Sequence, residues 1–180
     1  RERMGHIELC VPVSHIWFLR GVPSRIALIL GITAAAVEKV IYFAGYIVTN
    51  VSEEERARLL RELDTEYKNK LKELKNEEAR ETLKERMQET KKEIDSVQTG
   101  IVLDETTFHR FSVKYSTLFE AKIGAEAIYN LFTKLDLHTL QTELEAKRDK
   151  AGAAERVKLD KRLNLIKGMI HAEVRPEWMF

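Results

Sequence analysis

The pattern of apolar and polar residues changes several times in the first part of the chain, and each pattern predicts a different element. Residues 6–9 alternate polar and apolar side chains, which predicts a short half-buried strand. The apolar residues of 15–19 predict a short helical turn. Pro23 predicts a helix over about 23–30, because proline suits the first turn of a helix. The aromatic and β-branched residues at 46–48 predict a second strand, since such side chains pack well on a pleated surface.

Polar residues placed just before apolar periodic stretches predict where three helices begin. Thr33 is typical of an N-cap for a helix over 34–42. Ser52 followed by Glu55 forms a capping-box pattern, in which each residue satisfies a backbone N–H at the helix start. Asp104 predicts the cap of a further helix, and its apolar side carries three aromatic residues, Phe108, Phe111 and Tyr115.

Residues 52–98 differ in character from the rest of the chain. Between 53 and 95, 26 of 43 residues are charged, and apolar residues recur there at steps of three and four. The first apolar stripe consists of Leu60, Leu63, Tyr67, Leu71 and Leu74, and the second of Leu83, Met87, Ile94 and Val97. A break near Lys75–Asn76–Glu77 separates them. Two such narrow stripes predict an antiparallel helical hairpin, which we expect to be an insertion that is mobile relative to the main body.

The last third of the chain predicts further helices. Residues 124–128 are expected inside a helix that reaches about Leu135, where small side chains let a neighbouring backbone approach closely. Residues 137–172 predict a helix pair that turns at 151–153. Pro176 disfavours helix at Arg175, so residues 175–180 are expected to be extended.

These patterns together predict an α+β fold that is predominantly helical. It has small strand elements near the N-terminus, a helical core, a long inserted antiparallel helical hairpin and a C-terminal helix pair. We expect one domain segment formed by 1–51 and 101–180, with the charged helical hairpin inserted over 52–100.

Composition narrows the kinds of partner that the chain can have. Its 30 basic and 29 acidic residues leave a net charge of +1, so a nucleic-acid surface would have to be a local patch. The single cysteine, Cys10, excludes an internal disulfide and fits a reducing, cytoplasmic location. No apolar run is long enough for a membrane span and no secretory signal is present. The chain opens without Met and stops without a terminus signal, so we expect it to be cut from a longer protein.

Motifs of catalytic sites are absent from the sequence. It contains no phosphate-binding glycine loop, no His-Glu-x-x-His pair and no Gly-x-Ser-x-Gly elbow. The carboxylates lie beside Lys or Arg, as on a solvated helical face. His6, Cys10 and His15 lack the paired spacing of a zinc site, and a packed or hydrogen-bonded role is favoured. Trp17 and Phe18 could stack on bases, but their apolar neighbours favour core packing.

One charge feature remains as a candidate binding surface. Basic residues gather around the tip and outer face of the last helix pair, at Lys147, Arg148, Lys150, Arg156, Lys158, Lys161 and Arg162. Asp149, Glu155 and Asp160 dilute them. Such a tip can contact phosphates without reading a base sequence. From the residues alone, a solvated surface with salt bridges is the favoured interpretation.

The sequence contains several long motifs, which are Arg1–Leu9, His15–Leu19, Pro23–Ile26, Tyr42–Phe43 with Tyr46–Val48, Ala121–Ile128, Lys161–Leu163 and Arg175–Met179. In these motifs it resembles one protein family, the largest subunit (beta-prime) of bacterial RNA polymerase, in its clamp region. The motifs keep the order they have in that family and cover residues 1–50 and about 104–180. Residues 52–100 depart from the shorter form of the family and resemble an elaboration seen in some bacterial lineages.

The resemblance implies a role in DNA-directed RNA synthesis without a catalytic centre in this segment. In the family the clamp closes over downstream duplex DNA. For the basic residues of the last helix pair, the resemblance therefore favours contact with DNA over a solvated surface with salt bridges. The nucleic-acid-binding residues it implies are Arg20, Arg148, Lys150, Arg156, Lys158, Lys161 and Arg162. The family's zinc-binding cysteines lie upstream and its magnesium-binding loop downstream, so no cofactor is expected here. Implied partners are the beta, alpha and omega subunits, sigma factor and double-stranded DNA, with no membrane.

Two other interpretations remain open at this stage. An independent helical scaffold would bind protein partners through the 52–98 hairpin and ignore DNA. A small stand-alone enzyme is the weakest alternative, because no nucleophile, acid–base pair or metal site supports it.

Overall fold

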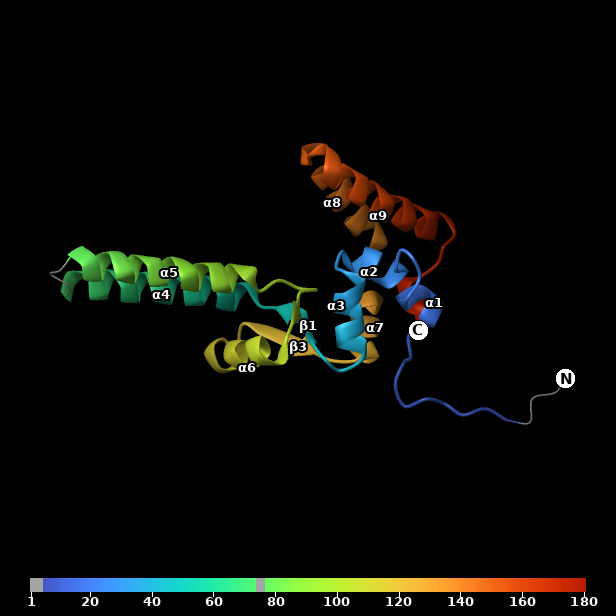
Figure 1. Cartoon of the computed structure of the whole chain (residues 1–180), viewed down its shortest axis with the longest axis horizontal. Helices are drawn as coiled ribbons and strands as arrows, with labels where there is room; N and C mark the ends of the chain where they lie inside the picture. Colours follow the sequence, from blue (N-terminus) through green and yellow to red (C-terminus); the bar gives the residue numbers. More distant parts are fainter. Residues whose placement is uncertain (1–4, 74–76) are drawn as a thin grey trace. The chain divides into compact units, whose positions relative to one another are not determined.

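The computed structural model describes residues 5–73 and 77–180. Within them lie nine α-helices, one 3₁₀ turn and three short strands, so the predicted α+β, predominantly helical fold is confirmed. The elements, drawn in Figure 1, are α1 (Ile16–Leu19), α2 (Arg25–Leu30), α3 (Ala34–Ile41), β1 (Tyr46–Val51), α4 (Glu53–Glu73), α5 (Glu77–Ser96), β2 (Val102–Leu103), α6 (Glu105–Lys114), β3 (Phe119–Lys122), α7 (Ala125–Thr133), α8 (Leu137–Lys150), α9 (Ala153–His171) and η1 (Pro176–Met179). The chain forms two compact units, Arg1–Ile47 with Lys122–Phe180, and Val48–Ala121.

Side-chain caps fix the helix starts that the sequence predicts. The Thr33 hydroxyl accepts the backbone N–H of Ala36, and the Asp104 carboxylate accepts that of Thr107. The Ser52 hydroxyl accepts the N–H of Glu55 at 3.3 Å. Each bond satisfies one of the backbone donors that a helix start leaves unpaired, which is why these starts can be read locally.

The first unit is built around α2, which packs against α1, α3 and α9. Ile26 and Ile29 on α2 are fully buried, as are Val37 and Val40 on α3. The C-terminal residue Phe180 packs edge to face against Phe132 of α7, with ring centroids 5.9 Å apart. This small helical core holds α9 in place.

The second unit combines a small sheet with aromatic packing. The strand order is β2-β1-β3, and the N–H of Ser52 donates to the carbonyl of Leu118 at the end of β1. Its core contains Val48, Ile94, Val97, Leu103, Phe111, Tyr115, Leu118 and Phe119. Phe111 and Phe119 meet edge to face at 6.5 Å, a favourable arrangement for ring quadrupoles.

Helices α4 and α5 lie side by side in this unit (Figure 1) and run in opposite directions. Arg56 near the start of α4 donates to the carbonyl of Val97, just beyond the end of α5. Asp64 farther along pairs with Lys91 at 2.7 Å. Ile94 is the buried residue of α5, so the apolar contact is concentrated at the sheet end. Leu74 and the turn expected at Lys75–Asn76 lie outside the described residues, and the predicted insertion boundaries at 52 and 100 stay a prediction.

Three local predictions are wrong. Residues 6–9 form no strand and are exposed, because an alternating pattern becomes a strand only where a sheet edge pairs with it. Gly124 lies before α7 and not inside it, with φ +87°, and a Cβ there would lie 2.9 Å from the Phe43 ring. Residues Pro176–Met179 form a 3₁₀ turn, since only Arg175 itself takes the extended conformation that precedes proline.

The start of α2 also differs slightly from the prediction. Ser24, not Pro23, is the N-cap, and its hydroxyl accepts the N–H of Ala27 at 3.3 Å. Proline therefore precedes the cap, and the helix proper runs from Arg25 to Leu30.

Candidate nucleic-acid interface

The candidate surface is carried by α8 and α9, which pack along their length and are joined at Ala151 and Gly152. Leu144, Leu163 and Ile166 are buried between them, with four half-buried residues around, Leu137, Leu140, Leu159 and Ile170. This apolar seam turns the charged side chains outward. The predicted helix pair and its turn are thus confirmed.

Two ion pairs across the seam neutralise part of the charge. Arg148 Nε lies 2.7 Å from Asp160 Oδ1, and Lys167 Nζ lies 2.7 Å from Glu145 Oε1. The hydrogen bond from Lys167, followed by one from Gln141, lowers the pKa of the Glu145 carboxyl. The positive charge of Arg148 is therefore partly neutralised by Asp160.

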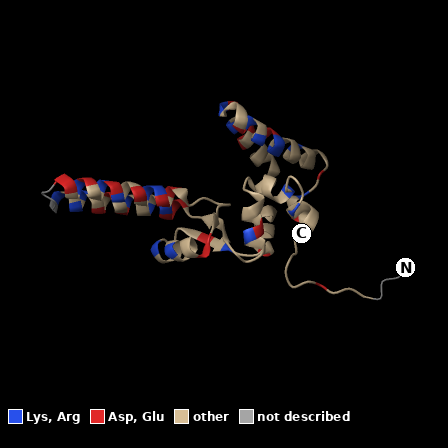
Figure 2. Ribbon diagram, viewed as in Figure 1, with Lys and Arg blue, Asp and Glu red and all other residues tan. Residues whose placement is uncertain are grey.

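Several lysines around the tip have no such compensation. Within the described part of the chain, four exposed lysines of this helix pair form no ion pair, Lys147, Lys150, Lys158 and Lys161. Arg156 is also exposed, and its guanidinium donates to the Asp149 carbonyl at 3.3 Å, which ties it to the tip. Over 147–162 seven basic and three acidic residues leave four positive charges. Figure 2 shows blue predominating at the tip of α8 and α9.

Arg162 lies apart from these exposed cations. Its guanidinium donates to the carbonyl of Ile29 at 2.7 Å and packs where a Cβ on Gly31 would meet it at 2.5 Å. Burial lowers the pKa of Arg162. It satisfies a carbonyl in the last turn of α2, a common role for a basic side chain near a helix C-terminus. Sequence reasoning grouped it with the tip because the two are adjacent in the chain.

Arg20 lies at the end of α1, where two neighbours engage it. Its Nε is 3.3 Å from Glu38 Oε1, and its guanidinium carbon is 5.7 Å from the centre of the Tyr42 ring. The Arg20 side chain remains 56% exposed, so a further anion could still reach it. Arg148, Lys150, Arg156, Lys158 and Lys161 are all exposed residues of α8 and α9, whereas Arg20 lies at the end of α1.

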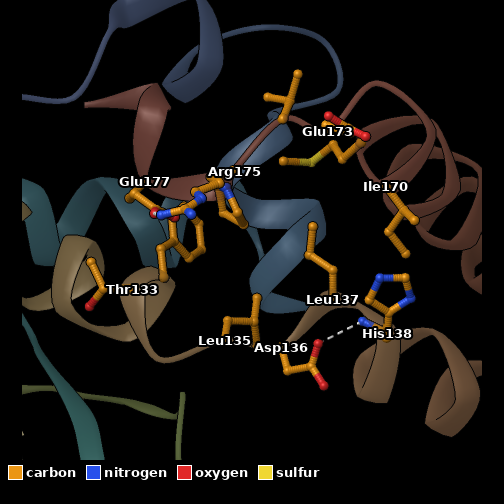
Figure 3. A pocket seen from close by; sticks show the side chains of 13 residues that line it. Thr133, Leu135, Asp136, Leu137, His138, Ile170, Glu173, Arg175 and Glu177 are labelled. Atoms are coloured by element: carbon orange, nitrogen blue, oxygen red, sulfur yellow. Dashed lines mark hydrogen bonds and ion pairs between the residues drawn. The ribbon is translucent and has the colours of Figure 1, made fainter.

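A pocket of about 420 Å³ lies at the base of the helix pair, between α7, α8 and the segment around η1 (Figure 3). Two of its three carboxylates already have structural partners. Asp136 caps α8, and the hydrogen bond from the Thr139 side chain, then that from the His138 backbone, lowers its pKa. Glu177 pairs with Arg175 at 3.7 Å. Glu173 is the third carboxylate of the lining, so the pocket shows no pair of acids left over for general acid–base chemistry.

The N-terminal candidates take different positions. His15 accepts the backbone N–H of Trp17 at 3.2 Å and caps α1, which is a hydrogen-bonded role. Cys10 is exposed. The expectation that Trp17 packs in the core is wrong, since its side chain is 78% exposed, while Phe18 is half-buried. A pattern of apolar neighbours cannot tell which side of a four-residue helix faces the core.

Metal-binding clusters and membrane spans are both absent from residues 5–73 and 77–180. No three His, Cys, Asp or Glu side chains gather in those ranges in a way that could hold a metal ion. No helix in the same ranges is long and apolar enough to cross a lipid bilayer.

The sequence interpretation missed Arg25 and Asn164 as neighbours of Lys161. Arg25 and Asn164 line a cavity with Lys161 on the side of α9 that faces α2. Helical spacing offered a signal, because Lys161, Asn164 and Leu165 share one face of α9.

Comparison with known proteins gives consistent matches over the whole chain. Residues 1–180 match the family described as RNA polymerase Rpb1, domain 1. The chain is similar to "DNA-directed RNA polymerase subunit beta'" of Dehalococcoides mccartyi (31% identity, 99% of this chain, 16% of the relative), Weissella hellenica (34%, 99% and 13%) and Fusobacterium nucleatum (35%, 99% and 10%). The chain thus spans between 10% and 16% of the length of these relatives.

Proposed function

Because the chain belongs to the family of the bacterial RNA polymerase beta' subunit, in the domain described as Rpb1 domain 1, we propose that it is part of the clamp that holds downstream duplex DNA. The tip of α8 and α9 contacts DNA phosphates in this proposal. The contacts do not depend on sequence, as an enzyme that must transcribe any template requires.

One observation carries the proposal most strongly, the set of exposed lysines at the tip that form no ion pair in the described part of the chain. A lysine that is already paired gains little from a phosphate, because it must first lose its partner. Lys147, Lys150 and Lys158 bear no such cost. Arg148, which pairs with Asp160, and Arg156, which donates to the Asp149 carbonyl, are carried by the same two helices.

The whole enzyme is also part of the proposal. This chain would act within a DNA-directed RNA polymerase, a nucleotidyltransferase, alongside beta, alpha and omega subunits and sigma factor. The described residues do not fit the enzyme's magnesium or zinc, because they contain no cluster of metal-binding side chains. We assign to this chain the holding of DNA.

The test is duplex-DNA binding measured against salt concentration. We expect weak binding that falls steeply with salt, because released counterions drive it. The combined variant Lys147→Gln, Lys150→Gln and Lys158→Gln should flatten the slope of log K against log salt by about three, roughly one for each phosphate that no longer has a lysine beside it.

A matched variant keeps the test specific to the tip. Lys68→Gln, Lys84→Gln and Lys92→Gln removes the same charge from exposed positions of α4 and α5. It should leave the slope within about half a unit of the unmodified chain's. Equal slopes for the tip variant and the unmodified chain would refute the proposed DNA contact.

A further inference from the structure

A second surface of the first unit has a composition unlike the basic tip. Two adjoining cavities, of about 800 and 330 Å³, run beside α9 and share Phe18, Arg25, Asn164 and Leu165. Trp17 lines the first and Trp178 the second. We call this surface the tryptophan groove.

The two tryptophans are unusually exposed for their size. Trp17 is 78% and Trp178 62% exposed, and Val22 beside Trp17 is fully exposed. A covered tryptophan buries on the order of 150–250 Å² of surface. Leaving two of them in water, along one groove, is typical of a surface that another molecule covers.

Charge limits what that molecule can be. Arg25 and Lys161 line the groove and are exposed, as is Arg175, which also pairs with Glu177, and none of the described lining residues is Asp or Glu. The Arg25 guanidinium lies over the Phe18 ring, 5.6 Å from its centre. Stacking on one face leaves the edge N–H groups free for a carboxylate, which guanidinium binds in bidentate fashion.

The remaining lining favours polypeptide over a nucleic-acid strand. Leu28, Leu165, Met169, Val174 and Met179 form an aliphatic floor between the cations. Burying a partner's aliphatic side chains against such a floor is energetically favourable. Phosphates would lose their hydration there, and the groove does not supply a cation to compensate each of them.

We propose that the tryptophan groove docks a polypeptide segment in which apolar residues are flanked by Asp or Glu, supplied by another part of the same polymerase. This inference rests on the proposed function, in which the chain works within a longer subunit whose relatives extend six- to tenfold beyond it in length. Trp17, Trp178 and Arg25 are its anchors, and Lys161 pairs with an acidic flank.

The test is site-specific photo-crosslinking in the assembled polymerase. Benzoylphenylalanine replaces Val22, which is fully exposed and lines the larger cavity. We expect a crosslink to a polypeptide segment that carries Asp or Glu beside apolar residues. The same group in place of Ala146, an exposed residue of α8 outside both cavities, is the control and should not reach that segment.

A charge reversal then tests the recognition itself. Lys161→Glu should lower the crosslink yield roughly tenfold, because like charges oppose docking. Changing the acidic residue of the crosslinked segment to Lys should restore the yield, which a merely misfolded variant would not do. A crosslink to nucleic acid, a yield no higher than at Ala146, or a yield insensitive to Lys161→Glu would overturn the proposal. None of these results depends on Lys147, Lys150 or Lys158, so the DNA proposal stands or falls separately.

Discussion

At the scale of single residues, Arg162 shows how a basic side chain in a basic segment can serve the fold. Gly31 follows α2 at φ +74°, and without a Cβ it leaves room for the guanidinium. The guanidinium then takes the carbonyl of Ile29, which the helix end leaves without an N–H partner. Arg162 therefore connects α9 to α2.

Replacing this side chain should destabilise the protein. Arg162→Met keeps the length of the side chain but removes its donors, so the carbonyl of Ile29 loses its partner. We expect the free energy of unfolding to fall by about 1–3 kcal/mol in urea denaturation. The neighbouring change Lys161→Met, at an exposed position, should stay within about 0.5 kcal/mol. Equal effects from both variants would contradict the assigned role of Arg162.

At the scale of elements, a small charge network joins α5 to α6. Glu93 Oε2 lies 2.9 Å from Lys114 Nζ and accepts the Tyr115 hydroxyl at 3.2 Å. The Lys114 hydrogen bond is the largest cause that lowers the pKa of the Glu93 carboxyl, with smaller contributions from Tyr115 and Arg110. The network holds the base of the α4–α5 pair against α6.

The network makes stability depend on acid pH. Since the folded-state pKa of Glu93 lies below its ordinary value of 4.5, its stabilisation is present above that value and is lost as pH falls through the folded pKa. In urea titrations between pH 6 and acid pH, Glu93→Gln should be less stable than the unmodified chain at pH 6. The two should converge as pH falls below about 4.5.

A variant elsewhere on α5 supplies the comparison. Glu85 is exposed and forms no ion pair in the described part of the chain, so Glu85→Gln should track the unmodified chain at every pH. A constant difference between Glu93→Gln and the unmodified chain at all pH values would show that the charge of Glu93 does not matter.

The outer part of α4 and α5 should be dispensable for the rest of the second unit. Leu59, Leu60, Ile94 and Val97 pack on its core, whereas the helices beyond Asp64 and Lys91 contribute little buried surface. Because Asp64 and Lys91 are paired, residues 65–90 can be replaced by a short Gly-Ser linker. We expect the melting temperature of the shortened chain to change by less than about 5 °C.

DNA binding gives the shortened chain a second readout. Under the clamp proposal its salt-dependent affinity should match that of the unmodified chain. If the shortened chain loses binding to a protein partner, and neither the shortened nor the unmodified chain binds DNA, the result favours the scaffold interpretation. A deletion of all residues 53–97 would not be equivalent, because it removes Ile94 and Val97 from the core.

At the scale of the whole molecule, charge is almost balanced while its distribution is not. The net charge is +1, yet 147–162 alone carry four positive charges in excess. In the clamp proposal, attraction to DNA comes from that segment, over distances of about one Debye length. This is why the salt slope, rather than the affinity at one salt concentration, separates a tip contact from general attraction.

The parts of the fold that could be predicted are those set by near neighbours in the chain. Thr33, Ser52 and Asp104 cap helices through bonds to residues three positions on, and the stripe of Leu144, Leu163 and Ile166 forms the seam of α8 and α9. The candidate site was predicted only in part. The tip cations are exposed as expected from their polar face, but the role of Arg162 depends on α2, more than a hundred residues away.

By itself the sequence determined the helical character of the chain, the places where α3, α4 and α6 begin, and the family to which it belongs. Those features rest on local capping, periodic apolar spacing and long ordered motifs. Only the tertiary structure decided which charges are already paired and which large apolar side chains remain in water. Both depend on contacts between distant segments, so Arg162 is held by α2, while Trp17, Arg25 and Trp178 line one groove beside α9.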